Sequence, residues 1–159
     1  MKIKVNVKVK TLRAYKLVAD RARSSKEELP RVKDSKDIYE LLISSIYDPD
    51  EVDVTESLYA IFLDSSNCVK GYIKVSSGGV ANVLVDPRII FCSALKCLAT
   101  GIIVSHNHPS GVPRPSNNDR VLTQKLSAGA KLLDIRLVDH IIVGSNRYYS
   151  FLDNGELTF

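Results

Sequence analysis

The sequence predicts an α/β or α+β fold, because segments with the pattern of strands and segments with the pattern of helices are mixed along the chain. Stretches that alternate apolar and polar residues indicate strands, and stretches with apolar residues three and four apart indicate helices. Hydrophobic residues make up 45% and charged residues 25% of the 159 residues, which is typical of a soluble globular domain. A chain of this length fits one compact domain with a modest extension.

The first 50 residues are predicted to form an extension of one strand and two helices. Residues 2–10 alternate apolar with basic or polar side chains, which predicts a half-buried strand. Residues 12–23 combine helical spacing with good helix formers. Ser35 is predicted to cap a second helix that reaches about Ile46, before Asp48-Pro49-Asp50 ends it.

The main domain is predicted over residues 51–159, after a boundary near residue 50 that separates it from the extension over residues 1–50. It opens with a strand over 56–63, which an Asp-Ser-Ser-Asn turn joins to a second strand over 68–76. The alternation and the turn residues together predict a β-hairpin at the start of this domain.

The rest of the domain is predicted to combine helices with further strands. Pro87 can occupy the first position of a helix that runs to Leu98, and Gly101 closes that segment. A short strand over 102–104 is wholly apolar, as in a strand that is buried on both faces. The remaining elements, in chain order, are a loop over 106–115, a helix from Ser116 to about Leu133 and a hairpin of strands over 135–143 and 147–151.

Positive charge is concentrated at the start of the chain. Residues 1–33 hold 11 Lys/Arg and three Asp/Glu, a net charge of +8, and the other residues hold 11 and 15, a net charge of −4, which together give +4. A basic arm can bind nucleic acid through its phosphates. The alternative is a solvated surface, which the scarcity of aromatic residues for base stacking favours, since Tyr15 stands alone there.

Cysteine usage and hydropathy indicate the compartment. The chain has three cysteines and no Cys-x-x-Cys pair, which argues against a disulfide framework and against a cysteine zinc knuckle. No apolar run approaches the ~20 residues that cross a bilayer, and the N-terminus lacks the apolar stretch of a signal peptide. We therefore predict a cytoplasmic protein that does not enter a membrane.

The pattern with the clearest chemistry runs from Ser105 to Asp119. His106 and His108 stand two residues apart, so that both imidazoles point to the same side of an extended segment. Asp119 follows on the first turn of the next predicted helix, after a loop with three prolines. Two imidazole nitrogens and one carboxylate oxygen leave a tetrahedral zinc one open position, as in catalytic sites. We predict a zinc site at these three residues, although an isolated His-x-His is more often an exposed pair.

Hydrolysis at such a site needs a base and a donor for the developing oxyanion. Glu56 is the predicted base, because it opens a strand expected to lie beside residues 102–104. The Ser116 hydroxyl is the predicted oxyanion donor, and with Asp119 it also matches a capping box, which is a compatible role. His140 is predicted to be a buried, hydrogen-bonded structural residue, and a role in orienting the zinc ligands stays open.

The string His106-Asn107-His108-Pro109-Ser110-Gly111, followed by Pro115-Ser116, Asp119 and Thr123, resembles the core of the RadC family. That family is a bacterial branch of the JAB/MPN metalloproteins. The signature of the superfamily is a glutamate, then His-x-His-Pro, a spacer and Ser-x-x-Asp, and each part is present here. The resemblance covers roughly residues 50–153.

This resemblance implies a mixed sheet flanked by helices, in the cytidine-deaminase-like architecture of JAB/MPN domains, with zinc at the edge of the central strand. Active relatives in the superfamily cleave amide or isopeptide bonds, so it implies a metallopeptidase with a peptide or isopeptide substrate. The RadC branch also carries a DNA-repair label. The residues that the resemblance assigns are His106, His108 and Asp119 as ligands, Glu56 as base and Ser116 as oxyanion donor.

The sequence also permits two other functions. A DNA- or protein-binding module without hydrolysis is the main alternative, supported by the basic N-terminus, and hydrolysis of phosphodiesters by the same metal is another. Residues 1–50 do not resemble the helix-hairpin-helix region of typical RadC proteins. HNH nucleases disperse their named residues through the chain, and zinc deaminases need His-x-Glu and Pro-Cys-x-x-Cys, neither of which occurs.

Overall fold

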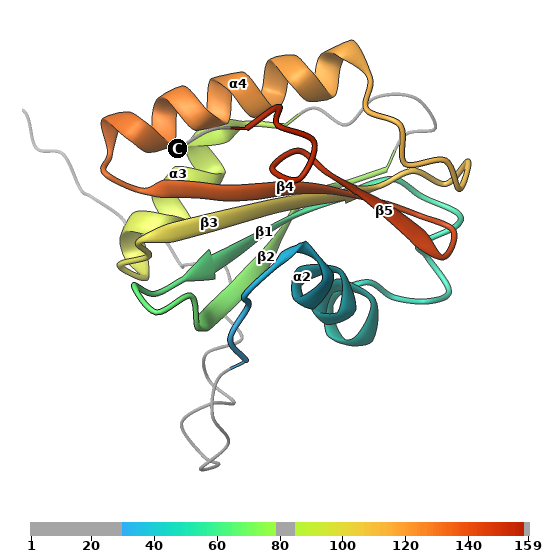
Figure 1. Cartoon of the computed structure of the whole chain (residues 1–159), viewed down its shortest axis with the longest axis horizontal. Coiled ribbons are helices and arrows are strands. Elements are labelled where there is room, and N and C mark those ends of the chain that lie inside the picture. Colours follow the sequence, from blue (N-terminus) through green and yellow to red (C-terminus); the bar gives the residue numbers. More distant parts are fainter. Residues whose placement is uncertain (1–29, 79–84, 158–159) are drawn as a thin grey trace, which may run out of the picture.

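A five-stranded mixed sheet forms the centre of the protein, with helices on both of its faces (Figure 1). The computed structural model describes residues 30–78 and 85–157, so the strand predicted over 2–10 and the helix predicted over 12–23 lie outside the described residues. The strands are β1 (Ser57–Leu63), β2 (Val69–Ser77), β3 (Gly101–Asn107), β4 (Arg136–Gly144) and β5 (Arg147–Ser150), in the spatial order β2-β1-β3-β4-β5.

The strand directions make the sheet mixed. β1 runs antiparallel to both β2 and β3, β3 runs parallel to β4, and β5 returns antiparallel to β4. All seven residues of β3 are buried, because this strand is central and has helices over both faces. The predicted fold class, an α+β arrangement with a mixed sheet, is confirmed.

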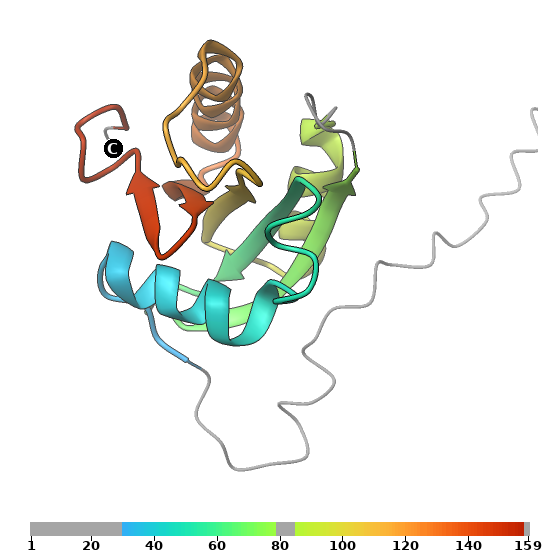
Figure 2. The same ribbon diagram turned by 90° about the vertical axis from the view of Figure 1, so that its right-hand side faces the viewer.

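Two apolar cores lie on opposite faces of the sheet, each between the sheet and a layer of helices. On one face, α3 (Pro87–Lys96) and α4 (Asn117–Leu132) pack against even-numbered side chains of the central strands, such as Ala60 and Val104. On the other face, α2 (Ser35–Leu41) and the π-helix η1 (Leu42–Ile46) pack against odd-numbered ones, such as Ile61. Figure 2 shows α2 and α4 on opposite sides of the sheet. Alternation along each strand therefore decides which side chains can meet near α4.

The described segment before residue 50 belongs to this packing. Val32, Ile38, Leu42 and Ile46 are buried together with side chains of β1 and β3. The predicted boundary near residue 50 is not tested by this packing and stays a prediction. Among the residues that the structure describes, no helix is both long enough and apolar enough to span a bilayer.

The start of α2 differs from the prediction. Asp34, not Ser35, is the N-cap, and its carboxylate accepts a hydrogen bond from the Asp37 backbone N–H at 2.8 Å. An aspartate one residue earlier supplies the capping oxygen, so Ser35 becomes the first helical residue. Its hydroxyl instead donates to Asp153 and lies 3.0 Å from the Tyr148 hydroxyl, which ties α2 to the chain around β5.

A buried carboxylate connects β4 to the segment after β5. Asp139 is fully buried. It accepts hydrogen bonds from the Ser150 hydroxyl at 2.6 Å, from the His140 backbone N–H at 2.7 Å and from the Leu152 backbone N–H at 3.0 Å. Burial raises the pKa of Asp139 to about 6, although these three hydrogen bonds oppose the rise. The folded protein therefore holds a proton there more tightly than the unfolded chain.

Asp139→Asn is expected to change how stability depends on pH. The pKa of Asp139 is higher in the folded protein than the value of about 4 in the unfolded chain. The stabilisation that this difference provides is therefore fully present below about pH 4 and is lost as the pH rises to about 6. The asparagine keeps one oxygen for the two backbone donors. Relative to the wild type, the free energy of unfolding of the variant should therefore rise by about 2–3 kcal/mol between pH 4 and pH 7. Urea unfolding at both pH values measures this, and an equal difference at both would contradict it.

Candidate metal centre

Three predicted ligands converge at the end of β3. His106 lies in this strand between Leu58 of β1 and Ile142 of β4, His108 follows the strand directly, and Asp119 lies in the first turn of α4. The loop was predicted to begin at His106, but β3 continues to Asn107. One ligand atom from each of the three side chains can be chosen so that all lie within 4.8 Å of one another. The structure thus brings together a candidate metal-binding group.

The spacing of these atoms matches what a small cation needs. The two Nε2 atoms of His106 and His108 lie 3.0 Å apart, and Asp119 places Oδ1 3.2 Å from the first and Oδ2 3.8 Å from the second. Zinc bonds of about 2.0–2.1 Å in a tetrahedron put neighbouring ligand atoms about 3.3 Å apart. Two ring nitrogens this close need a proton or a cation between them, so the donor set fits a metal ion.

The loop after β3 fixes the His108 ring. Its backbone N–H donates to the Val143 carbonyl at 2.8 Å, and its Nδ1 lies 3.0 Å from the Val112 carbonyl. A carbonyl can only accept, so Nδ1 carries the proton and Nε2 offers a lone pair to the site. Gly111 supports this turn with a φ of +75°, and a Cβ there would lie 2.5 Å from Ser145 Oγ, so only glycine fits.

Asp119 is held by a capping box, as the sequence predicted. Its Oδ2 accepts hydrogen bonds from the Ser116 backbone N–H and hydroxyl, both at 2.6 Å, and its own N–H donates to Ser116 Oγ at 3.2 Å. Burial alone would raise the pKa of Asp119, but His106 and Ser116 together lower it well below the usual range. The carboxylate is therefore ionised and turns Oδ1 toward His106.

The predicted oxyanion role of Ser116 is a separate matter from its capping role. Its hydroxyl proton points to Asp119 Oδ2, so the hydroxyl would have to rotate to face a substrate oxygen. The oxyanion role stays a prediction.

Glu56 lies one residue before β1, and strand pairing indicates where it stands. Leu58 pairs with His106 in the antiparallel β1–β3 ladder. Continuing that register by two residues places Glu56 opposite His108, on the sheet face that carries His106. Its backbone carbonyl accepts a hydrogen bond from the Gly78 N–H at 3.0 Å. This placement is compatible with the predicted base, and the catalytic role stays a prediction.

Asn107 is a residue that sequence reasoning missed. Its side chain is nearly fully buried, and its Oδ1 accepts from the Ser57 N–H at 2.8 Å while its Nδ2 donates to the carbonyls of Thr55 at 2.8 Å and Val52 at 2.6 Å. The backbone on both sides of Glu56 is therefore tied to the residue between the two histidines. Because the sequence predicted a loop from His106 onward, no local pattern indicated that Asn107 would be buried in β3.

Asn107→Ala is expected to lower the free energy of unfolding by about 2–4 kcal/mol, since it leaves three backbone groups without their partner. Bound metal should remain, because the hydrogen bonds of this side chain go to backbone groups at and just before the start of β1 and not to the three ligands. Chemical unfolding and metal analysis measure the two effects. Asn154→Ala is the matched control, since it removes one hydrogen bond to the Ser150 carbonyl and should cost about 1 kcal/mol. Equal losses in the two variants would contradict the anchoring role.

His140 connects to the candidate centre from β4. The ring is fully buried, its Nε2 lies 2.9 Å from His106 Nδ1, and its Nδ1 lies 2.6 Å from Thr123 Oγ1. Burial is the main cause that lowers the pKa of His140 well below its ordinary value, and the neighbouring His106 ring adds to it. The prediction of a buried, hydrogen-bonded histidine is confirmed.

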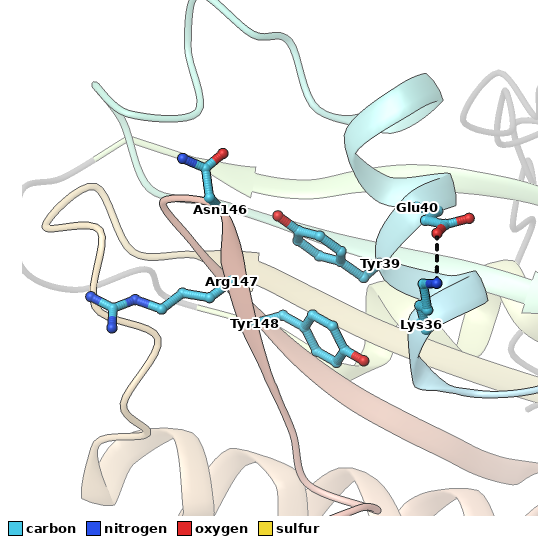
Figure 3. A pocket seen from close by; sticks show the side chains of 6 residues that line it. All are labelled: Lys36, Tyr39, Glu40, Asn146, Arg147 and Tyr148. Carbon is cyan, nitrogen blue, oxygen red and sulfur yellow. Dashed lines mark ion pairs between the residues drawn. The ribbon is translucent and has the colours of Figure 1, made fainter.

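A pocket lies away from this centre, between α2 and the β4–β5 hairpin (Figure 3). Tyr39 and Tyr148 stack there with ring centroids 4.7 Å apart, and Lys36 pairs with Glu40 at 3.7 Å. Asn146 and Arg147 complete its lining. It contains none of the candidate ligands.

Comparison with known proteins agrees with the motif. The family model described as "RadC-like JAB domain" matches residues 32–156. A protein named "UPF0758 protein" from Flavobacterium johnsoniae is 36% identical over 128 residues, which are 80% of this chain and 54% of that protein. A protein of the same designation from Protochlamydia amoebophila is 47% identical over 102 residues, 64% of this chain and 44% of that protein.

A third such protein, from Thermotoga maritima, is 36% identical over 152 residues, 95% of this chain and 66% of that protein. The matched part of the chain thus spans between 44% and 66% of the length of these curated relatives. Their shared designation states no activity. The predicted resemblance is confirmed, and it extends on the N-terminal side to the segment that leads into α2.

Proposed function

Because the chain belongs to the family of RadC-like JAB domains, we propose that it is a zinc-dependent hydrolase that cleaves amide bonds in a peptide or isopeptide substrate. The observation that carries this proposal is the convergence of the ring nitrogens of His106 and His108 with the Asp119 carboxylate. Two imidazoles and one carboxylate suit zinc and leave room for a further ligand, as catalytic sites require.

The proposed roles follow from where each side chain stands. His106, His108 and Asp119 would hold the metal, which when bound supplies a Lewis acid that polarises a carbonyl and activates water. Glu56 would accept the proton of the attacking water and pass it to the leaving nitrogen. Ser116 would turn its hydroxyl toward the developing oxyanion. Asn107 would keep Glu56 in position through the backbone on either side of it.

Substrate cleavage is the experiment that tests this proposal. The zinc-loaded chain and a chelator-stripped sample are incubated with a proteome-derived peptide library and with isopeptide-linked peptides, and new termini are identified by mass spectrometry. We expect cleavage in the zinc-loaded sample that the stripped sample lacks. A protein that binds one zinc per chain and cleaves neither substrate set would overturn the hydrolase proposal.

DNA binding through the basic segment is a second candidate function, favoured by the net charge of +8 on residues 1–33. Contacts to phosphate make such binding strongly salt-dependent. Fluorescence polarisation with a labelled duplex should show affinity that falls steeply between about 50 and 200 mM salt. Binding that survives removal of the metal would separate this function from hydrolysis, and no binding at low salt would exclude it.

A further inference from the structure

A chain of buried hydrogen bonds runs from one candidate ligand to another through two residues that bind no metal. It links His106 Nδ1 to His140 Nε2 at 2.9 Å, His140 Nδ1 to Thr123 Oγ1 at 2.6 Å, and Thr123 Oγ1 to the Asp119 carbonyl at 2.7 Å. It therefore crosses from β3 to β4 and then to the first turn of α4. His140 and Thr123 are both almost entirely inaccessible to water.

The direction of the protons in this chain follows from its last acceptor. The Asp119 carbonyl can only accept, so the Thr123 hydroxyl donates its single proton there. That hydroxyl can then only accept from His140, so the proton on His140 belongs to Nδ1. A buried imidazole without a carboxylate on its ring is neutral, which leaves His140 Nε2 as an acceptor. His106 must therefore donate from Nδ1, which leaves its Nε2 as the ring atom that can bind a cation.

This tautomer of His106 is the one that metal binding needs. Its Nε2 is the atom that faces His108 Nε2 and Asp119 Oδ1. The opposite tautomer would place a proton on Nε2 and close the site to a cation. The proton order of the chain and the geometry of the candidate centre thus favour the same state.

We propose that Thr123 and His140 are positioning residues that fix the metal-binding tautomer of His106 and hold it in register with Asp119. The proposal rests on the metal-binding part of the proposed function. Packing keeps the middle of this chain of hydrogen bonds in place, since the His140 ring stacks on Phe151 with centroids 4.8 Å apart and planes 8° from parallel. Outer partners of this kind typically change metal affinity 10–100-fold.

Nitrogen NMR of the histidine rings tests the proton order directly, before any metal is added. The protein contains three histidines, two in this chain of hydrogen bonds and the third, His108, beside His106 in the candidate centre, so ¹⁵N-histidine labelling reports on these rings alone. In wild-type protein we expect His140 to carry its proton on Nδ1, with a coupling across the hydrogen bond from His106 Nδ1 to His140 Nε2. A proton on His140 Nε2 would overturn the proposal.

Thr123 substitutions test the consequence for metal binding. Thr123→Val removes the hydroxyl and keeps the shape, so the His140 Nδ1 proton loses its acceptor and the other tautomer becomes populated. The zinc dissociation constant, measured by competition with a chelating dye, should rise about 10–100-fold. Thr123→Ser keeps the hydroxyl and should restore both the affinity and the wild-type ring spectrum. Rescue of this kind would not occur if Thr123 served packing alone.

Ser150→Ala is the matched control. It removes another buried hydroxyl, which donates a hydrogen bond to Asp139 and does not belong to the chain of hydrogen bonds between His106 and Asp119. It should leave zinc affinity unchanged. A folded Thr123→Val protein that binds zinc as tightly as the wild type would overturn the positioning role and leave the metal site standing. A wild type that binds no zinc would instead overturn the proposed function itself. If Thr123→Val does not fold, the wild-type ring spectrum decides.

Discussion

Glu56→Gln is expected to reduce zinc-dependent amide cleavage by at least about a hundredfold while leaving one zinc bound per chain. A positioned base typically contributes 10²–10⁴-fold to the rate, and glutamine cannot accept the proton of the attacking water. The substitution keeps the size of the side chain and lies outside the three candidate ligands. Initial rates on a cleaved library peptide, with zinc content measured on the same samples, check both parts of the expectation.

Glu51→Gln serves as the control for this experiment. Glu51 is an exposed acid five residues earlier that pairs with Lys74 at 2.9 Å, and exposed pairs of this kind contribute little to stability. Its substitution should leave the rate unchanged. Full activity in Glu56→Gln would remove Glu56 from the mechanism, and loss of zinc in that variant would mean that the residue supports the metal rather than proton transfer.

Local patterns in the sequence were sufficient to predict most of the helices and strands that the structure describes. Pro87 and the Ser116 capping box mark helix starts that the structure reproduces, because a fixed φ and a side-chain acceptor act within one turn. The wholly apolar stretch before His106 correctly predicted a strand buried on both faces. The Asp34 cap was missed, since Asp and Ser cap almost equally well and adjacent candidates cannot be ranked from sequence.

The candidate ligands were predictable because their spacing is short, whereas their supporting contacts were not. His106 meets His140 across 34 positions and Asn107 meets Ser57 across 50. Such contacts depend on which strands become neighbours and in what register, and the β3–β4 pair contains an irregularity just before the site. Strand order is a property of the whole sheet, so no local pattern could have assigned His140 or Asn107 to their partners.

His108→Ala is expected to raise the zinc dissociation constant by more than about a hundredfold, since losing a ligand should exceed the effect of losing an outer partner. His108 is the suitable choice of the two histidines. Its side chain is 19% exposed, against 2% for His106. His106 is also hydrogen-bonded to His140, so removing the His106 ring would disturb the buried chain of hydrogen bonds as well. The His108 variant should therefore fold and report on the metal alone.

Thermal stability provides the second readout for the same variant. At a free zinc concentration about 1,000 times the dissociation constant, binding to the folded state alone stabilises a protein by about 4 kcal/mol. The wild type should gain this, and His108→Ala should gain less than about 1.5 kcal/mol at the same zinc concentration, because its dissociation constant is more than about a hundredfold higher. Equal stabilisation of both proteins would place zinc elsewhere on the chain, because the only ligand change is at the end of β3. Zinc contents that are equal in the variant and the wild type at a free zinc concentration near the wild-type dissociation constant would lead to the same conclusion independently of stability.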